Sequence, residues 1–305
     1  MKDMIYRCLM ALERRFGSWI FLLIAWHVAT GYFLLYPQRV AVSVRFYRCL
    51  FPERPRRHAL LCAWRQYHHF VYVFLDRFRL ANGDELPVTC EGWEHIDAAS
   101  RSGRGGIILM SHVGSWEIAA QLLRHRGQNN PGMKLLLFLG AKHREQIEKR
   151  QKRSVERSGI RVISVPEEGG SAMDILEGLN FLREGGLVSL TGDRLWGRDQ
   201  RTVTVRFAGG RARIPEIPYI LAMISEAPLL IFFGYRTGFG GYHLIAKPPL
   251  YVAAASRAER GKAIQATAQT YADLLAETVR SHPYEWYHFE PFLMDPVRGG
   301  KGHLP

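Results

Sequence analysis

Two residues with acid–base side chains, His112 and Glu117, lie five positions apart in the run Ser111-His112-Val113-Gly114-Ser115-Trp116-Glu117. A histidine titrates near neutral pH and can take a proton from a hydroxyl group. A carboxylate bonded to its other ring nitrogen would fix the tautomer and stabilise the imidazolium that forms. The pair therefore predicts a general base, His112, oriented by Glu117, for attack by a hydroxyl group without a serine or cysteine nucleophile.

The elements on either side of His112 decide whether the two side chains can meet. The apolar run Ile107–Met110 predicts a short buried strand. Ser115 predicts the N-cap of a helix over Trp116–Arg126, with Glu117 in its first turn. Two helical residues five positions apart diverge by about 140°. The pair can therefore converge only if His112 lies in the loop before the helix.

The same loop offers backbone hydrogen-bond donors. The amides of Gly114 and Ser115, at the start of the predicted helix, would face an oxyanion that develops beside His112. An alternative stays open, in which His112 is a strand-end histidine bonded to a backbone carbonyl. In that case Glu117 only complements the helix dipole.

Four segments of the chain, taken together, resemble a known family. The run SHVGSWE resembles the His-x4-Asp/Glu block of glycerolipid-type acyltransferases. Three others resemble the blocks that follow it in the lipid A biosynthesis late acyltransferases of the lauroyl and myristoyl kind. They are DRLWGR from Asp193, FAGGRARIP from Phe207 with one extra residue before the proline, and EWYHF from Glu285. The order and spacing of these segments match that family over roughly residues 15 to 292. The family belongs to the lysophospholipid/glycerolipid acyltransferase superfamily.

This resemblance implies a membrane-bound O-acyltransferase. Such an enzyme moves a fatty acyl group from acyl carrier protein or acyl-CoA to a hydroxyl of a lipid acceptor, in lipid A (lipopolysaccharide) biosynthesis. It implies an α/β fold, with a glycerol-3-phosphate-acyltransferase-like sheet flanked by helices. We expect it at the bacterial inner membrane, with the catalytic domain on the cytoplasmic side. Because a thioester supplies a good leaving group, we expect neither a metal nor a cofactor.

One segment departs from the family pattern. The usual Arg-Pro-x-x-Asn stretch after the second strand is replaced by Gly140-Ala141-Lys142-His143-Arg144-Glu145-Gln146. In the family that the chain resembles, this region helps to shape the site. An acceptor other than a lipid A precursor therefore stays open, such as ornithine lipid, aryl polyene lipid or a glycolipid.

Asp193 follows the apolar strand predicted over Leu187–Leu190, at what should be its carboxyl end. Ligands of open α/β sheets gather at such ends. Of its neighbours Arg194 and Arg198, one is expected to pair with Asp193 and the other to bind a phosphate of the carrier or the acceptor. A purely structural ion pair is the alternative.

Two further candidates lie in polar stretches. Arg144 stands near a predicted helix start, where a cation gains nothing from the helix dipole, so we expect it to contact an oxyanion or a phosphate. Glu168 lies in a loop that borders the site in the resembling family and is expected to contact acceptor groups. The dense basic run between Lys142 and Arg153 suits docking of acidic acyl carrier protein or an anionic lipid, or is simply a solvated face.

The composition indicates a folded protein, and its positive charge indicates an anionic partner. It has 305 residues and a net charge of +13, from 41 Lys and Arg against 28 Asp and Glu. An acidic carrier, an anionic membrane surface and nucleic acid all satisfy that balance. The four cysteines show no metal-site or disulfide pattern, which favours reduced thiols.

The N-terminal part predicts a membrane-associated helical arm over residues 1–85. Trp19–Tyr36 is an apolar stretch of eighteen residues without a formal charge, just long enough for a thin bilayer. Aromatic residues at its ends resemble interfacial anchors. His27 and Thr30 make it polar for a spanning helix, so an interfacial helix and a buried soluble helix stay open.

Residues 86–305 predict the catalytic domain. Short apolar runs alternate there with amphipathic stretches, which indicates a sheet covered by helices on both sides. Predicted strands are Ile107–Met110, Lys134–Leu139, Arg161–Val165, Leu187–Leu190, Val203–Phe207, Leu229–Tyr235 and Tyr242–Ala246. Predicted helices are Trp116–Arg126, Arg144–Ser158, Ser171–Arg183, Ile217–Ser225 and Ala258–Ser281.

Other classes of function were weighed against acyl transfer. A basic nucleic-acid-binding protein has no matching motif here and no use for the N-terminal stretch, so we expect no nucleic-acid partner. A non-catalytic membrane scaffold stays open on sequence alone. A metal hydrolase lacks a third ligand beside His112 and Glu117, and we expect no metal.

Overall fold

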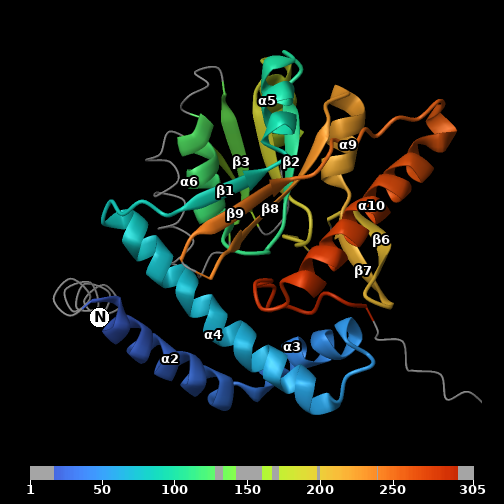
Figure 1. Ribbon diagram of the computed structural model, residues 1–305. Helices are drawn as coiled ribbons and strands as arrows, with labels where there is room; N and C mark the ends of the chain where they lie inside the picture. The colour runs from blue at the N-terminus through green and yellow to red at the C-terminus, as the bar shows by residue number, and fades with distance from the viewer. Residues whose placement is uncertain are drawn as a thin grey trace, which may run out of the picture.

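The computed structural model describes residues 17–127, 133–141, 160–166, 172–197, 200–238 and 240–294. Within them the chain forms the expected α/β fold, in which helices cover both faces of a central sheet. A layer of three N-terminal helices lies below the sheet in the view of Figure 1.

Seven strands make up the sheet, in the order β1-β9-β8-β2-β5-β3-β4. Every neighbouring pair is parallel except β8 with β9. The strands are β1 (Val88–Glu91), β2 (Gly106–Met110), β3 (Leu135–Ala141), β4 (Arg161–Pro166), β5 (Leu187–Thr191), β8 (Leu229–Arg236) and β9 (Tyr242–Ala246).

The central strand β2 shows why this sheet needs cover on both sides. All five of its residues are buried, as expected for a strand inside a parallel sheet. Because side chains alternate, Ile107 and Leu109 enter one core, and Ile108 and Met110 enter the other. The first core contains α8 (Ala172–Arg183), α9 (Ile217–Ser225) and α10 (Arg260–Ser281), and the second contains α5 (Trp93–Arg101) and α6 (Trp116–Gly127).

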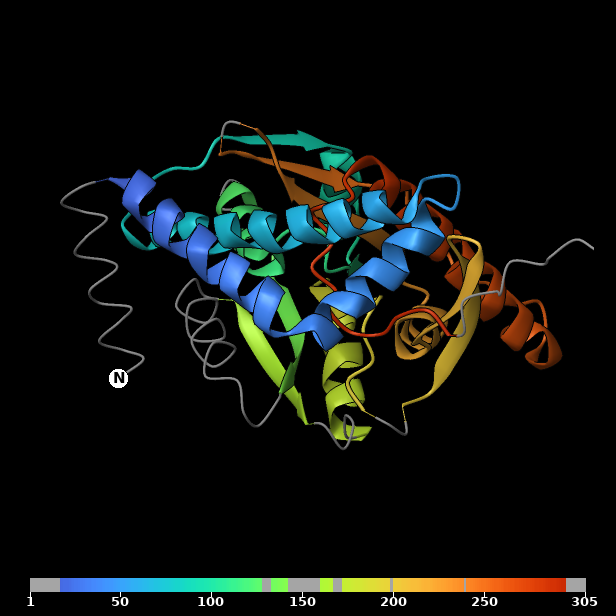
Figure 2. The same ribbon diagram turned by 90° about the horizontal axis from the view of Figure 1, so that it is seen from below.

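The N-terminal layer consists of α2 (Ser18–Leu35), α3 (Pro37–Leu50) and α4 (Arg56–Ala81). Helices α2 and α3 meet at 90° around Tyr36, because the residue before Pro37 is disfavoured in a helix. Figure 2 shows this layer from below, with α2 and α3 lying against α4. Among the described helices, none is by itself long and apolar enough to cross a bilayer, whereas the bent pair of α2 and α3 meets the requirement jointly.

Helix α4 is part of the main core as well as of the N-terminal layer. Its residues Cys62 and Ala63 are buried in the same cluster as Leu109 of the central strand. The amide nitrogen of Gln66 donates to the carbonyl oxygen of Trp286 at 2.5 Å. The division of the chain at residue 85 stays a prediction, and α4 would have to be counted on both sides of it.

A separate hairpin stands beside α10 in Figure 1. It pairs β6 (Thr202–Phe207) with β7 (Gly210–Pro215) in antiparallel register. Ala208 and Gly209 connect the strands, both with positive φ, which is the geometry of a tight two-residue turn. Buried and exposed residues alternate along both strands, so one face of the hairpin packs on the core and the other faces solvent.

The predicted elements agree with this structure where it describes them. All seven predicted strands are present, and the bounds of strands and helices shift by at most two residues. Three elements, β1, α5 and β7, were not predicted, because they are short and have weak apolar patterns. The helix predicted over Arg144–Ser158 lies outside the described residues.

Candidate active site

Two neighbouring strands bring His112 and Asp193 together. Strands β2 and β5 are parallel, and their last residues, Met110 and Thr191, are partners in the register. Each chain continues for two residues beyond that pair, to His112 and to Asp193. The two side chains therefore meet at the carboxyl edge of the sheet, where ligands of such folds bind.

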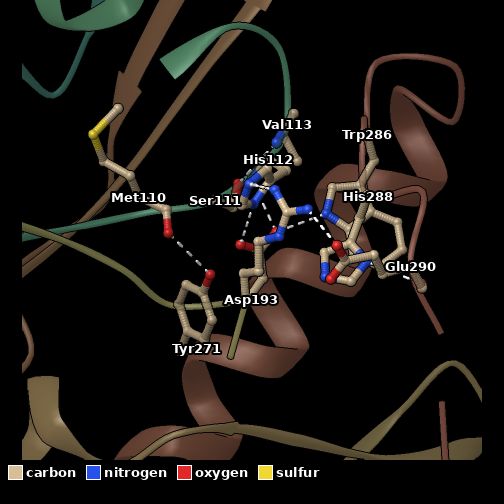
Figure 3. Close-up of polar contacts among 10 residues, drawn as sticks. Met110, Ser111, His112, Val113, Asp193, Tyr271, Trp286, His288 and Glu290 are labelled. Carbon is tan, nitrogen blue, oxygen red and sulfur yellow. Dashed lines mark hydrogen bonds and ion pairs between the residues drawn. The ribbon is translucent and has the colours of Figure 1, made fainter. Parts of the chain in front are cut away.

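Asp193 holds the His112 ring through a direct contact (Figure 3). The Nδ1 atom of His112 lies 2.8 Å from one carboxylate oxygen of Asp193. The backbone amide of His112 and the indole N–H of Trp286 both donate to the other oxygen, each at 2.8 Å. Three hydrogen bonds thus fix a carboxylate that is fully buried.

These contacts keep Asp193 ionised. Burial by itself would raise the pKa of its carboxyl group, but the charge and hydrogen bonds of His112, with a further contribution from His288, outweigh burial. The net result is a pKa well below the usual range. Because an ionised carboxylate only accepts hydrogen bonds, Nδ1 of His112 is the donor in this contact.

Arg194 lies at the other ring nitrogen of His112. Its Nη1 is 3.2 Å from Nε2 of His112, and its Nη2 donates to Glu290 at 2.7 Å. The guanidinium group therefore bridges the ring and the C-terminal segment. It therefore occupies the approach to Nε2 of His112.

The expected contact between Glu117 and His112 is wrong. Glu117 forms an ion pair with Arg77 of α4, at 2.6 Å between Nε and Oε2, and Asp193 takes the His112 nitrogen instead. The reason is geometric, since Glu117 belongs to the first turn of α6, which faces α4 at that point. His112 does lie in the loop before the helix, as expected.

Gly114 shapes this loop. It has φ of 69°, and a Cβ atom there would lie 1.9 Å from the carbonyl oxygen of Gly234, so only glycine fits. Its amide donates to the carbonyl of Glu285 at 2.7 Å, which corrects the expectation that this amide faces an oxyanion. Ser115 is confirmed as the N-cap, since its carbonyl and side-chain oxygen accept from Ala119 and Ile118.

The C-terminal segment closes the site from the other side. Trp286 pairs with Val113 as a bridge, and the amide of Tyr287 donates to the carbonyl of His112 at 2.8 Å. His288 places its ring 5.7 Å from that of His112, nearly perpendicular to it. Burial lowers the pKa of His288 to about 4, so this second histidine is neutral at physiological pH.

A mostly apolar cavity adjoins Arg194. Its volume is about 260 Å³, and it lies between the carboxyl ends of β3, β4 and β5 and the helices α8 and α9. Its apolar lining includes Phe138, Val165, Leu190, Trp196, Ile217 and Leu221. The arrangement can therefore place an apolar chain within reach of a base and a cation.

Three predicted site residues, Arg144, Glu168 and Arg198, lie outside the described residues, as does the basic run around Arg144. Among the residues the structure does describe, no group of three or more histidine, cysteine or acidic side chains is placed to hold a metal. The sequence analysis missed Arg77 and Glu290, which no motif marked. Trp286 and His288 appeared only as motif residues, without a role.

Comparison with known proteins identifies the family of this chain. A family model described as bacterial lipid A biosynthesis acyltransferase matches residues 72–293. A phosphatidylinositol mannoside acyltransferase of Mycobacterium tuberculosis (strain CDC 1551 / Oshkosh) is 27% identical over 233 residues, as is that of strain ATCC 25618 / H37Rv. The match covers 75% of this chain but 66% of those relatives, just under two thirds of their length. With the family model spanning most of its length, the chain belongs to the bacterial lipid A biosynthesis acyltransferase family.

Proposed function

We propose that the chain transfers a fatty acyl group from a thioester donor to a hydroxyl group of a lipid acceptor. In this proposal His112 is the general base and Asp193, in place of Glu117, orients it. The observation that carries the proposal is the hydrogen-bonded pair of His112 and Asp193 beside an apolar cavity. Acyl carrier protein and acyl-CoA are both candidate donors.

The reaction uses this chain's own groups at each step. The acceptor hydroxyl gives its proton to Nε2 of His112 while its oxygen attacks the thioester carbonyl. Asp193 stabilises the imidazolium that forms. When the tetrahedral intermediate collapses, the carbon–sulfur bond breaks and the imidazolium proton goes to the departing thiolate. The products are an ester and a free thiol.

Arg194 is the proposed electrophilic group. Its guanidinium stands at Nε2 of His112, beside the place where the oxyanion develops. The acceptor hydroxyl replaces it at the nitrogen, and Glu290 keeps the cation close by through the bond to Nη2. The backbone amide of Gly114 is engaged elsewhere, so a cation is the better donor for the oxyanion here.

The apolar cavity is the proposed site of the acyl chain. Its walls are aliphatic and aromatic, and Arg194 provides a polar end. A hydrocarbon tail gains free energy in such a place in proportion to the apolar area it buries. With the tail inside, the thioester carbonyl lies near Arg194 and His112.

For the acceptor we propose a glycolipid ahead of a lipid A precursor. The relatives that match this chain carry the name phosphatidylinositol mannoside acyltransferase, which denotes a glycosylated lipid. The sequence also departs from the lipid A enzymes at Gly140–Gln146. Ornithine lipid and aryl polyene lipid remain alternatives that the same assay distinguishes.

A lipid acceptor requires contact with a membrane, and α2 is the proposed point of contact. It exposes Trp19, Leu23, Ile24, Trp26, Val28, Tyr32, Leu34 and Leu35. Arginines of the following helix, Arg39, Arg45 and Arg48, would lie at the headgroups of anionic lipids. We place this contact on the cytoplasmic side of the bacterial inner membrane.

The test measures transfer of radiolabelled acyl groups from acyl carrier protein or acyl-CoA into lipid extracts by the purified full chain. His112→Ala should lower the rate by about 10³-fold or more, because the general base is lost. His95→Ala, in α5 and far from the site, is the matched control and should keep full activity. Undiminished transfer by His112→Ala would rule the mechanism out.

A further inference from the structure

A second hollow lies on the outside of the molecule, between the β6/β7 hairpin and α10. Its volume is about 510 Å³. Small residues form its floor: Val205, Gly261 and Ala266. Longer polar side chains form its rim: Arg206, Arg211, Lys262, Gln265 and Gln269. We refer to these eight residues as the hairpin groove.

Two glutamines of α10 fix the shape of the groove through hydrogen bonds to the backbone of β6. Gln269 accepts from the backbone amide of Arg206 at 2.8 Å and donates to its carbonyl at 3.0 Å. Gln265 donates to the carbonyl of Thr204 at 2.8 Å. The outer edge of β6 is therefore tied to α10 along its length, and the groove keeps its shape.

Positive charge gathers along one side of this groove. Arg206 and Arg211 are direct partners across the hairpin, and like charges in that position destabilise a strand pair. Arg213 and Lys262 add two more exposed cations beside them. In the part of the chain that the structure describes, no salt bridge joins any of these four side chains to an acid. The acids next to the groove in sequence are Glu259, just before α10, and Asp273 on α10, and Asp273 accepts from Gln269.

We propose that the hairpin groove docks a protein that presents an acidic helix. For the acyl transfer proposed above, on which this part rests, that partner is the protein that carries the acyl thioester. Carboxylates of the helix would neutralise Arg206, Arg211 and Lys262, and the small floor residues leave room for its closest approach. Charge complementarity of this kind speeds and orients association.

The composition of the groove favours a protein over a bilayer or a nucleic acid. None of the exposed large apolar side chains in the described residues lies on the hairpin or on α10. Most of those in the N-terminal layer lie on α2, which is away from the hairpin in both Figure 1 and Figure 2, and the others are Tyr36, Leu60 and Leu61. The groove also lacks an exposed aromatic ring on which a base could stack.

The same hairpin connects this groove to the active site. Side chains of a strand alternate between its faces, so Arg206 points outward and Phe207 inward. The ring of Phe207 lies 5.9 Å from that of Trp286, which holds Asp193. Arg201 and Pro215, at the base of the hairpin, line the apolar cavity. A carrier docked outside would therefore deliver its thioester to the adjoining cavity.

The experiment reverses charge in the groove with Arg206→Glu/Arg211→Glu. The matched control is Arg104→Glu/Arg183→Glu, two exposed arginines at the amino ends of β2 and β5. The full chain is assayed with a purified bacterial acyl carrier protein bearing an acyl group, and with the same acyl group on pantetheine, which has no protein and no phosphate. Binding of fluorescent apo-carrier is measured separately by anisotropy, and binding to anionic phospholipid vesicles by sedimentation.

We expect KM for the carrier-linked donor and Kd for the apo-carrier to rise about tenfold or more in the groove variant alone. Rates with acyl-pantetheine should stay within about twofold of wild type. An unchanged KM and Kd for the carrier would overturn the proposal, as would loss of vesicle binding with carrier binding intact. If the double reversal impairs folding, Arg206→Gln/Arg211→Gln is used instead, with the same outcomes. If wild type binds the carrier at the groove but transfers no acyl group, the proposed function fails and the docking surface stands.

Discussion

Asp193 and Glu117 are two buried acids near the loop that holds His112, and they bind different partners. Asp193 contacts His112, whereas Glu117 contacts Arg77. By chain position Glu117 is the obvious neighbour of His112, five residues away, while Asp193 is 81 residues away. The comparison shows that proximity in a sheet register counts for more than spacing in a motif.

The two acids also differ in what they support. Asp193 has three hydrogen-bond donors, and two of them belong to the histidine it orients. Glu117 connects α6 to α4, and so connects the catalytic loop to the N-terminal layer. Removing the first acid should therefore stop chemistry in a folded protein. Removing the second should weaken the fold and spare the chemistry.

The largest effect is expected for Asp193→Asn. The amide can no longer stabilise an imidazolium, and activity should fall by about 10³- to 10⁴-fold. Asp273→Asn, an exposed residue of α10, is the control and should be unaffected. Initial rates and circular dichroism together check the prediction. A fully active Asp193→Asn would remove the distinction between the two acids.

Glu117→Gln should act on stability. It removes the negative charge from the buried ion pair of Glu117 with Arg77, which costs about 3 kcal/mol of unfolding free energy. The rate per folded molecule should change by less than about threefold. Chemical denaturation measures the first quantity and initial rates the second, with Glu94→Gln in the first turn of α5 as control. Inactivity with unchanged stability would instead support a His112–Glu117 pair.

His288 should make the free energy of unfolding depend on pH. It stays neutral in the fold down to about pH 4, whereas its ordinary pKa is 6.5. Between those values the unfolded chain binds more protons, so the free energy of unfolding falls as the pH drops. From pH 6.5 to 5 the loss should reach about 1.5 kcal/mol. Denaturation of His288→Gln at several pH values should show a shallower slope, and an equal slope would contradict the assignment.

The smallest effect is expected for Trp286→Phe. It removes one of the three donors to Asp193 while keeping an aromatic ring against Phe46 and Phe292. Activity should fall by about tenfold, since a hydrogen bond to a charged group contributes about 1.5 kcal/mol or more. Asp193 stays ionised at assay pH, because its pKa lies far below that range, so the rate should fall without a change in the pH–rate profile. A rate equal to wild type would mean that Trp286 only packs.

Much of the fold could be predicted from the sequence because it depends on short-range patterns. Apolar runs such as Ile107–Met110 identify strands by composition, and Ser115 marks a helix start by its side-chain oxygen. The same reasoning placed His112 in a loop. β7 escaped because its inward residues Gly210 and Ala212 are small, so the apolar half of its alternation is weak.

The acid that pairs with His112 could not be predicted from short-range patterns. Both Asp193 and the strand before it were predicted, but neither strand sequence shows that β2 and β5 are neighbours in the sheet. Nor does any local pattern mark Glu290 as the residue that anchors Arg194. The role of α4 was also hidden, since its ion pairs reach residues that are far away in the chain.

By itself, then, the chain determined its α/β class, its strands and helices, and the loop that exposes one basic imidazole. Those properties follow from side-chain size, polarity and backbone preference within a few residues. Only the tertiary structure decided which acid faces that imidazole, because β2 and β5 had to become neighbours before His112 and Asp193 could meet. A buried charge pairs with whatever the packed core brings within reach, and that is a property of the whole sheet.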